Sequence, residues 1–262
     1  MKLLVTGAQG FVGSHLVHNL GAIPITSDVT EFEGLYQEIR EKSEGQHFTL
    51  IHTAALTDVE YCEKNRAKAF HVNVRGTDNV LASIPKTGKV ILLSTCHVFS
   101  GKNYFPYSER HSPDPTNYYG STKFGAEAVL STYRVPSVAV RLGKGYDGNL
   151  LQKILMTDEA VPSFLKRSFI HVEDIVNLLG KIAELDFSTF PLFKKWYRVL
   201  HLGNPNQNYS YDLFYNLVRD KHNQPPLPKR TLYEQRDADR PLRCTLNTSK
   251  LKGLIDYQFR SL

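Results

Sequence analysis

Residues 2–13 read KLLVTGAQGFVG, a short apolar run that breaks into a glycine-rich turn and then enters a helical pattern. Gly7 permits a tight turn, Gly10 lets backbone approach a pyrophosphate, and Gly13 allows a helix to pack closely on a strand. The helix that follows would offer unpaired N–H groups and the positive end of its dipole to that anion. Because the turn directly follows the first strand, dinucleotide binding is favoured over a merely structural turn.

Outward from this turn, strand-like and helix-like segments alternate. The periodicity predicts strands over 2–6, 22–26, 48–56, 89–95 and 137–142, and helices over 11–20, 31–42, 64–83 and 117–132. This order is typical of an α/β fold with a doubly wound parallel sheet, the Rossmann architecture.

After residue 142 the regularity loosens, although 171–185 and 210–220 still read as helices and 197–203 as a strand. We therefore expect a dinucleotide-binding domain over 1–142, to which 171–186 and 197–203 return. The remainder of 143–262 is expected to form mainly a small, irregular substrate-binding cap.

Composition narrows the class of protein. Hydrophobic residues make up 41% of the 262 residues and charged residues 22%, an ordinary soluble balance. No apolar stretch approaches the ~20 residues that span a bilayer, and the first residues lack the features of a signal peptide. Three cysteines without CxxC spacing favour a reducing, cytoplasmic location and argue against a disulfide framework or a metal site. The net charge of +6 comes without a long basic run, so an anionic small molecule explains it as well as nucleic acid does.

The stretch NYYGSTKFGAE, residues 117–127, places Tyr119 four residues before Lys123. On a helix the two side chains would share a face. A free phenol titrates near ~10, and a neighbouring cation favours its ionised form, so the pair suits acid–base chemistry. The pattern alone favours a solvated pair on a surface helix, and only the rest of the chain overturns that interpretation.

Asp28 follows the second strand at about the distance expected of an acid that bonds a cofactor ribose. Because it runs straight into the next helix, capping that helix is the safer interpretation. Contacts with the ribose or with an adenine pocket stay open.

Five motifs, in this order, resemble the extended short-chain dehydrogenase/reductase family: TGAQGFVG (6–13), HTAALTD (52–58), VNVRGT (72–77), LLSTCHVFSG (92–101) and YGSTK (119–123). The segments DRPLRCTLNTSKL (239–251) and STCHVFSG are similar to the dTDP-4-dehydrorhamnose reductase branch of that family. The resemblance covers nearly the whole chain.

The resemblance implies roles for individual residues. Tyr119 would protonate a carbonyl oxygen as hydride arrives, and Lys123 would hold the nicotinamide ribose and lower the pKa of the tyrosine. Thr95 would donate a hydrogen bond to the same oxygen, where charge develops. The implied cofactor-binding residues are Gly7, Gln9, Gly10, Phe11, Val12, Gly13, Asp28, Val29, Ala54, Ala55, Leu56, Thr57, Lys123 and Leu142. Ser94, Arg167 and Arg240 are the implied substrate-binding residues, with Ser94 supporting Thr95.

The chain also departs from the branch pattern. Cys96 and His97 stand where the branch has Asp-Tyr. Cys96, beside Thr95, could be a reactive thiol, but we favour a small buried hydrophobe. His97 could donate to the substrate, but we favour a structural histidine. RSFIHVED, residues 167–174, is more similar to the sugar epimerase/dehydratase branch, in which the arginine contacts the nucleotide-sugar. Glu173 and Asp174 are expected to begin a helix, where they complement its dipole.

The family resemblance implies an NAD(P)H-dependent reductase that acts on a 4-keto, nucleotide-activated deoxysugar. The cofactor would be NAD or NADP, with NADPH favoured by the resemblance. One alternative is a nucleotide-sugar epimerase or dehydratase that retains NAD. Another is a non-catalytic, NAD(P)-binding regulatory subunit resembling the beta subunit of methionine adenosyltransferase. No nucleic-acid or membrane partner is expected, and relatives suggest a homodimer formed by helices 64–83 and 117–132.

Overall fold

The computed structural model describes residues 2–187, 198–230 and 238–262. Its centre is a parallel sheet with the strand order β2-β1-β3-β4-β5-β9. The strands are β1 (Lys2–Thr6), β2 (Ile23–Ile25), β3 (Phe48–His52), β4 (Gly88–Thr95), β5 (Ser137–Leu142) and β9 (Val199–Leu202). The chain leaves β1 toward β2 on one side and then crosses to β3 on the other. The strand order therefore reverses between β1 and β3, which is where open α/β sheets bind ligands. The predicted doubly wound sheet is confirmed.

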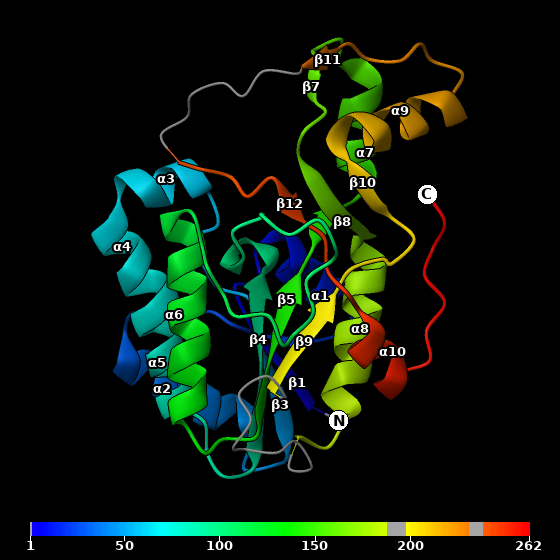
Figure 1. Cartoon of the computed structure of the whole chain (residues 1–262). Coiled ribbons are helices and arrows are strands. Elements are labelled where there is room, and N and C mark those ends of the chain that lie inside the picture. The colour runs from blue at the N-terminus through cyan, green and yellow to red at the C-terminus, as the bar shows by residue number, and fades with distance from the viewer. Residues whose placement is uncertain (1, 188–197, 231–237) are drawn as a thin grey trace.

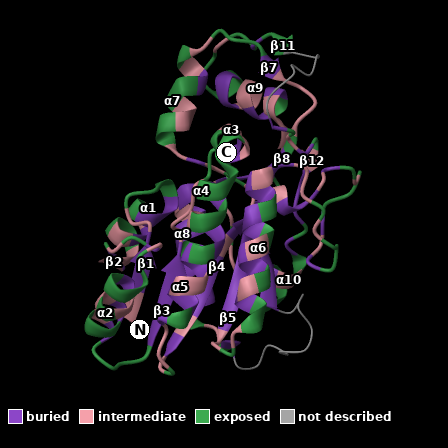
Figure 2. Cartoon of the chain, turned by 90° about the vertical axis from the view of Figure 1, so that its left-hand side faces the viewer, coloured by how far each residue is buried: buried purple, intermediate pink, exposed green. Residues whose placement is uncertain are grey.

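Helices cover both faces of this sheet (Figure 1). One face carries α1 (Phe11–Leu20), α8 (Val172–Glu184) and α10 (Ser249–Leu254). The other carries α2 (Phe32–Ser43), α5 (Gly76–Ala82) and α6 (Tyr118–Thr132). In Figure 2 the buried strands lie behind α5 and α6. The helices are held by apolar stripes; on α8, for example, Ile175, Leu179 and Ile182 are fully buried against β-strand residues such as Val138.

The predicted helix over 64–83 is confirmed from Arg66 to Ala82, although a π-helical turn interrupts it and a separate helix precedes it. α3 (Val59–Lys64) ends at Asn65, α4 (Arg66–Phe70) follows, and a π-helical turn over His71–Arg75 leads into α5. Asn65 leaves helical geometry, with φ −121° and ψ 52°. The break lets α3 lie at the end of the sheet, where it reaches the cap.

The cap consists of short elements from distant parts of the sequence. β6 (Lys144–Tyr146), β8 (Lys166–His171), β10 (Asn208–Ser210) and β12 (Arg243–Cys244) form a second sheet. α7 (Gly148–Met156) and α9 (Tyr211–Lys221) pack beside it, and β7 (Val161–Pro162) pairs with β11 (Lys229–Arg230). Stacking of Phe169 on Phe214, with ring centroids 3.9 Å apart, anchors α9 to the second sheet.

Several segments after residue 142 return to the large sheet. β9 pairs with β5, α8 packs on α1, and residues after α10 bury Ile255 in the sheet core. The predicted strand over 197–203 appears as β9, while Tyr197 lies outside the described residues. The division of the chain into two domains at residue 142 stays a prediction. In the described ranges, no helix is both long and apolar enough to cross a membrane.

Candidate functional site

The glycine turn between β1 and α1 has the geometry that the sequence predicts. Gly7 adopts φ +70°, and a Cβ there would lie 2.6 Å from the backbone nitrogen of Ala54. A Cβ on Gly13 would lie 2.1 Å from the carbonyl oxygen of Gly7, so only glycine lets α1 pass this closely. Gly10 caps α1 without a side-chain hydrogen bond. The first N–H groups of α1 therefore have no side-chain cap at the turn, as an anion-binding helix end requires.

The loop after β3 is fixed by Asn73, a buried residue of the π-helical turn. Leu56 donates its N–H to Asn73 Oδ1 at 2.7 Å. Asn73 Nδ2 in turn donates to the Leu56 carbonyl at 3.0 Å and to Thr122 Oγ1 at 2.9 Å. One side chain thus ties the loop to α6. The role of Asn73 was not predicted, although it lies within the VNVRGT motif.

A cavity of about 540 Å³ opens at the carboxyl ends of β1, β3, β4 and β5, between the large sheet and the cap. The predicted site residues that line it are Gly10, Phe11, Val12, Ala55, Thr57, Ser94, Thr95, Tyr119, Lys123, Leu142, Arg167 and Arg240. Gly7 and Gly13 do not line the cavity, but they allow the close packing of the turn that forms part of its wall. Gln9, Asp28, Val29, Ala54 and Leu56 lie outside the lining. The cavity therefore collects all three predicted catalytic residues and half of the predicted cofactor set.

Tyr119 and Lys123 lie on the first turns of α6 and face the cavity. Asn117 caps the helix by accepting the N–H of Gly120 at 2.8 Å. The two side chains are only 8% and 3% exposed, so the interpretation as a solvated surface pair is wrong. His97 contacts the Tyr119 ring edge-on, with centroids 5.8 Å apart. Because both side chains are buried, their pKa values depend on the surrounding protein groups rather than on solvent.

The pKa of Tyr119 differs from the expectation that Lys123 lowers it. Burial raises the pKa of the phenol, and a hydrogen bond with Thr95 only partly opposes this effect. Burial also lowers the pKa of the Lys123 amine to about 8, while the Glu127 carboxylate acts in the opposite direction. At neutral pH the pair therefore holds a neutral phenol and a protonated amine. This is the state from which a tyrosine donates a proton.

Behind Tyr119 and Lys123 lies a buried ion pair that was not predicted. Arg141, on β5, donates from its terminal nitrogen to Glu127 Oε2 at 2.7 Å and from Nε to Glu127 Oε1 at 3.0 Å. Ser94 donates its hydroxyl to Glu127 Oε1 at 2.6 Å. That hydroxyl is thus engaged by Glu127, although Ser94 lines the cavity. In the sequence, only the i+4 spacing of Lys123 and Glu127 places Glu127 on the same helix face as Lys123; nothing local pairs Glu127 with Arg141.

The cap side of the cavity is cationic. Arg167, on β8, is buried and donates to the carbonyl of Lys166 at 2.7 Å. Arg240 lies 3.4 Å from Glu60 Oε1 on α3, and Lys144 is exposed at the cavity edge. Burial and these three cations hold the pKa of His97 well below its ordinary value, so the imidazole is neutral. Because His97 is neutral, the positive charge of this wall comes from Arg167, Arg240 and Lys144, which suit an anionic ligand.

Asp28 does not cap α2, so that interpretation is wrong. Its Oδ1 accepts the N–H and the hydroxyl of Thr30 at 2.9 and 2.8 Å, whereas Glu31 is the capping residue and makes no side-chain bond. These hydrogen bonds lower the pKa of Asp28. Val29 is buried against Gly76.

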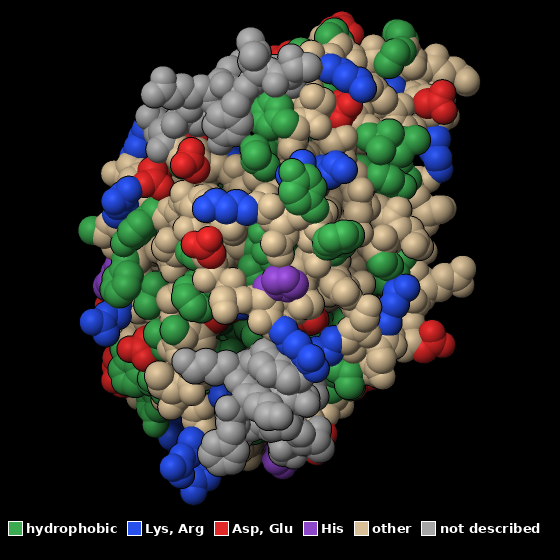
Figure 3. Space-filling model, viewed as in Figure 1, with side chains coloured by type: hydrophobic (Ala, Val, Ile, Leu, Met, Phe, Trp, Pro, Cys, Tyr) green, Lys and Arg blue, Asp and Glu red, His purple; other side chains and the backbone are tan. Residues whose placement is uncertain are grey.

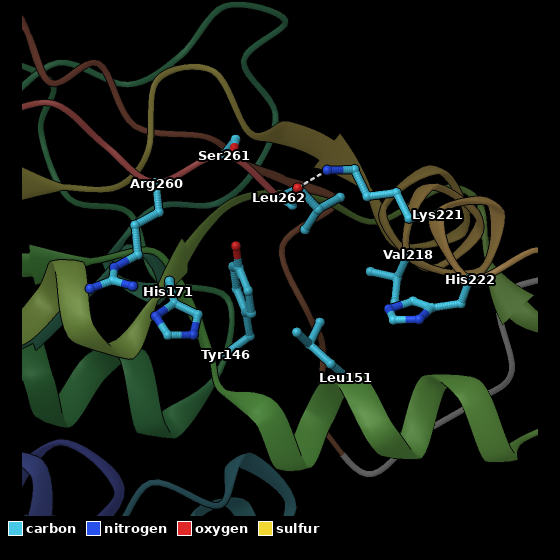
Figure 4. Close-up of a pocket in the computed structure, with 9 residues that line it drawn as sticks. All are labelled: Tyr146, Leu151, His171, Val218, Lys221, His222, Arg260, Ser261 and Leu262. Carbon is cyan, nitrogen blue, oxygen red and sulfur yellow. Dashed lines mark hydrogen bonds between the residues drawn. The ribbon is translucent and has the colours of Figure 1, made fainter.

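A second cavity, of about 420 Å³, lies in the cap (Figure 4). Its lining includes His171, Lys221, His222 and Arg260, and it shares Tyr146 with the first cavity. Lys221 hydrogen-bonds the carbonyl oxygen of Leu262. None of the predicted site residues line it. Within the described part of the chain, no group of three or more His, Cys, Asp or Glu side chains is arranged to hold a metal ion. On the face seen in Figure 3, basic side chains are dispersed among acidic and apolar ones.

The chain resembles known sugar-nucleotide proteins along most of its length. It is 32% identical to GDP-6-deoxy-D-talose 4-dehydrogenase of Aggregatibacter actinomycetemcomitans over 70% of this chain and 72% of that one. It is 28% identical to dTDP-4-dehydrorhamnose reductase of Burkholderia thailandensis over 58% of this chain and 55% of that one. Among solved structures, dTDP-4-dehydrorhamnose reductase of Bacillus anthracis in complex with NADP superposes with a TM-score of 0.86. That likeness covers 100% of this chain and 96% of the other at 24% identity, and it shows the fold.

The family model described as the RmlD substrate binding domain matches residues 1–261. This match spans the glycine turn, Tyr119 and Lys123 on α6, and the cap, so it includes both walls of the cavity. The chain therefore belongs to the RmlD substrate-binding-domain family.

Proposed function

We propose that the protein is an NAD(P)H-dependent reductase that acts on a 4-keto, nucleotide-activated deoxysugar. The observation that carries this proposal is the convergence of Thr95, Tyr119 and Lys123 on one cavity that also contains the N-terminus of α1. Membership of the RmlD family and relatives named as reductases and a dehydrogenase of such sugars support it.

The residues around the glycine turn fit a dinucleotide. A Cβ at Gly7 or Gly13 would fill the turn, and the Gly10 N–H already donates to the Gly7 carbonyl at 2.9 Å. The backbone N–H groups of Phe11 and Val12, the first residues of α1, are left at the cavity. These groups would hold the pyrophosphate, and Ala55, Thr57 and Leu142 would line the rest of the cofactor site. When bound, the reduced nicotinamide supplies the hydride for the reaction.

The chain's own groups would handle the proton and the developing charge. Tyr119, held neutral by burial, donates its proton to the substrate carbonyl oxygen. In the ligand-free site Thr95 hydrogen-bonds the phenol, and on substrate binding its single hydroxyl proton would be donated to the substrate oxygen instead. Lys123 remains protonated below a pH of about 8, which places a positive charge beside the site as the oxygen gains electron density.

Arg167, Arg240 and Lys144 would bind the diphosphate of the sugar nucleotide. Arginine donates two parallel hydrogen bonds to phosphate, and the three side chains lie on the cap wall that faces the catalytic residues. The buried position of Arg167 favours a role in substrate binding rather than general attraction of anions.

The experiment is a turnover assay on a panel of nucleotide-4-keto-6-deoxysugars with NADH and NADPH. We expect one reduced cofactor to be oxidised for each sugar reduced. Purified protein that retains oxidised cofactor and interconverts sugars without net redox change would instead favour the epimerase, which the position of Arg167 also suits. Absence of both activities, together with capture of a stoichiometric protein partner, would favour a regulatory subunit.

A further inference from the structure

Two of the three cysteines meet beside Thr95. Cys96 begins a 3-10 turn directly after Thr95, and Cys244 lies on β12 in the cap, 148 residues later. The Cys244 thiol lies 3.0 Å from the Cys96 carbonyl oxygen, to which it donates. Both side chains belong to one buried cluster.

Backbone hydrogen bonds hold the two cysteine-bearing segments side by side. Arg243 donates its N–H to the carbonyl of Gly101 at 3.2 Å, and Tyr107 donates to the carbonyl of Thr245 at 2.8 Å. A Cβ on Gly101 would lie 2.5 Å from the Leu242 nitrogen, so the two segments are in direct contact. The fold therefore holds the two cysteine-bearing segments in direct contact.

The two thiols differ in access and in reactivity. Cys96 lines the cavity, whereas Cys244 is fully buried behind it. The neighbouring Cys244 thiol and the nearby Arg167 cation lower the pKa of Cys96, while burial raises the pKa of Cys244. Since the thiolate is the nucleophilic form, Cys96 is the thiol that reacts first with a solute in the cavity.

We propose that Cys96 and Cys244 form an oxidisable dithiol that small hydroperoxides reach through the cavity and convert into a disulfide. The Cys96 thiolate attacks hydrogen peroxide, an S–O bond forms as the O–O bond breaks, and the departing hydroxide is protonated to water. Cys244 sulfur then attacks Cys96 sulfur, the S–O bond breaks, and a second water leaves with the Cys244 proton. Two thiols are oxidised and one peroxide is reduced to two waters. This inference does not rest on the proposed enzymatic function.

Cys62 provides a matched control within the same chain. It is buried on α3, does not line the cavity, and burial raises its pKa to about 11. If burial alone determined thiol reactivity, Cys62 and Cys244 would be oxidised to the same extent. Pairing that follows the geometry leaves Cys62 reduced.

The test treats the full chain with hydrogen peroxide, alkylates the remaining thiols, and measures intact mass and unreduced peptide maps. We expect one alkylated thiol, at Cys62, and one disulfide between the Cys96 and Cys244 peptides that dithiothreitol reverses. Cys62→Ser should form the same disulfide. Cys244→Ser should leave a sulfenic acid at Cys96 that dimedone traps. Three alkylatable thiols after peroxide treatment of the wild-type chain, or a disulfide that includes Cys62, would overturn the proposal whatever the fate of the variants.

Discussion

The sheet wall and the cap wall of the cavity hold their functional groups in different ways. On the sheet wall, Tyr119 and Lys123 are buried, and the Glu127 carboxylate behind them bonds Ser94 and Arg141. On the cap wall, cationic side chains from separate segments face the cavity, and Lys144 is exposed. The difference suggests that the sheet wall determines protonation and chemistry, whereas the cap wall determines the affinity for an anionic ligand. Substitutions on the two walls should therefore have different consequences.

The largest effect on stability is expected from Glu127→Ala. It leaves the buried Arg141 charge without its carboxylate, and breaking a buried pair in this way costs ~3–5 kcal/mol of unfolding free energy. Chemical denaturation measures it. The control is Arg75→Ala, which removes an exposed pair with Asp78 at 3.8 Å and should cost only ~0–1 kcal/mol. Equal losses in the two variants would show that the buried network adds nothing beyond a surface pair.

A smaller loss of stability is expected from Gly13→Ala, at the turn of the sheet wall. The new Cβ would lie 2.1 Å from the Gly7 carbonyl oxygen, and such overpacking typically costs ~1–3 kcal/mol. Because α1 must move away from the turn, cofactor binding should be lost as well. Thermal unfolding and a fluorescence titration with NADPH measure the two effects. Gly148→Ala, where no atom lies within 4 Å of the added carbon, should change neither.

Arg167→Ala tests the cap wall. Since a hydrogen bond to a charged group contributes ~1.5–3 kcal/mol, we expect KM for the sugar nucleotide to rise by ~10–100-fold with little change in kcat. Lys166→Ala is the control, because Lys166 neighbours Arg167 on β8 but does not line the cavity. Lys144→Ala should raise KM less than Arg167→Ala, because Lys144 is exposed. A fall in kcat at unchanged KM in Arg167→Ala would contradict the division between the walls.

The sequence predicted the elements of the sheet wall better than those of the cap wall. The glycine turn and α6 were predicted because their signals are local: the spacing of Gly7, Gly10 and Gly13, and the i+4 spacing of Tyr119 and Lys123. β8 and β12 were not predicted, because each is a short, partly polar segment that becomes a strand only by pairing with a distant one. The short helix α3 before Asn65 was not predicted either, because six residues are too few to show a helical periodicity.

The direction in which a pKa shifts also could not be predicted from the sequence. A pairwise view of Tyr119 and Lys123 predicts a lowered phenol pKa, but the amount of burial depends on elements packed around the pair. Likewise, the Ser94 hydroxyl bonds Glu127, a residue 33 positions away. Such partners follow from the tertiary structure, and motif spacing alone does not contain them.

The smallest effect is a pH dependence of turnover. The Lys123 amine, with its pKa lowered to about 8, loses its proton as the pH rises through that value, so turnover should fall on the alkaline side. Tyr119 stays protonated in this range because its pKa is raised. Glu127→Gln removes the carboxylate that opposes the shift, so the alkaline limb should move to lower pH. A limb that stays in place in this variant would argue against Lys123 as its source.

The most direct test of the account compares Tyr119→Phe with the wild-type chain in single-turnover oxidation of NADPH by a nucleotide-4-keto-deoxysugar, with cofactor affinity measured alongside. The account predicts a rate lower by ~10²–10⁴, the usual contribution of a general acid, with cofactor affinity retained. Full turnover in the Phe variant would contradict the assignment of Tyr119 as the proton donor and, with it, the proposed mechanism.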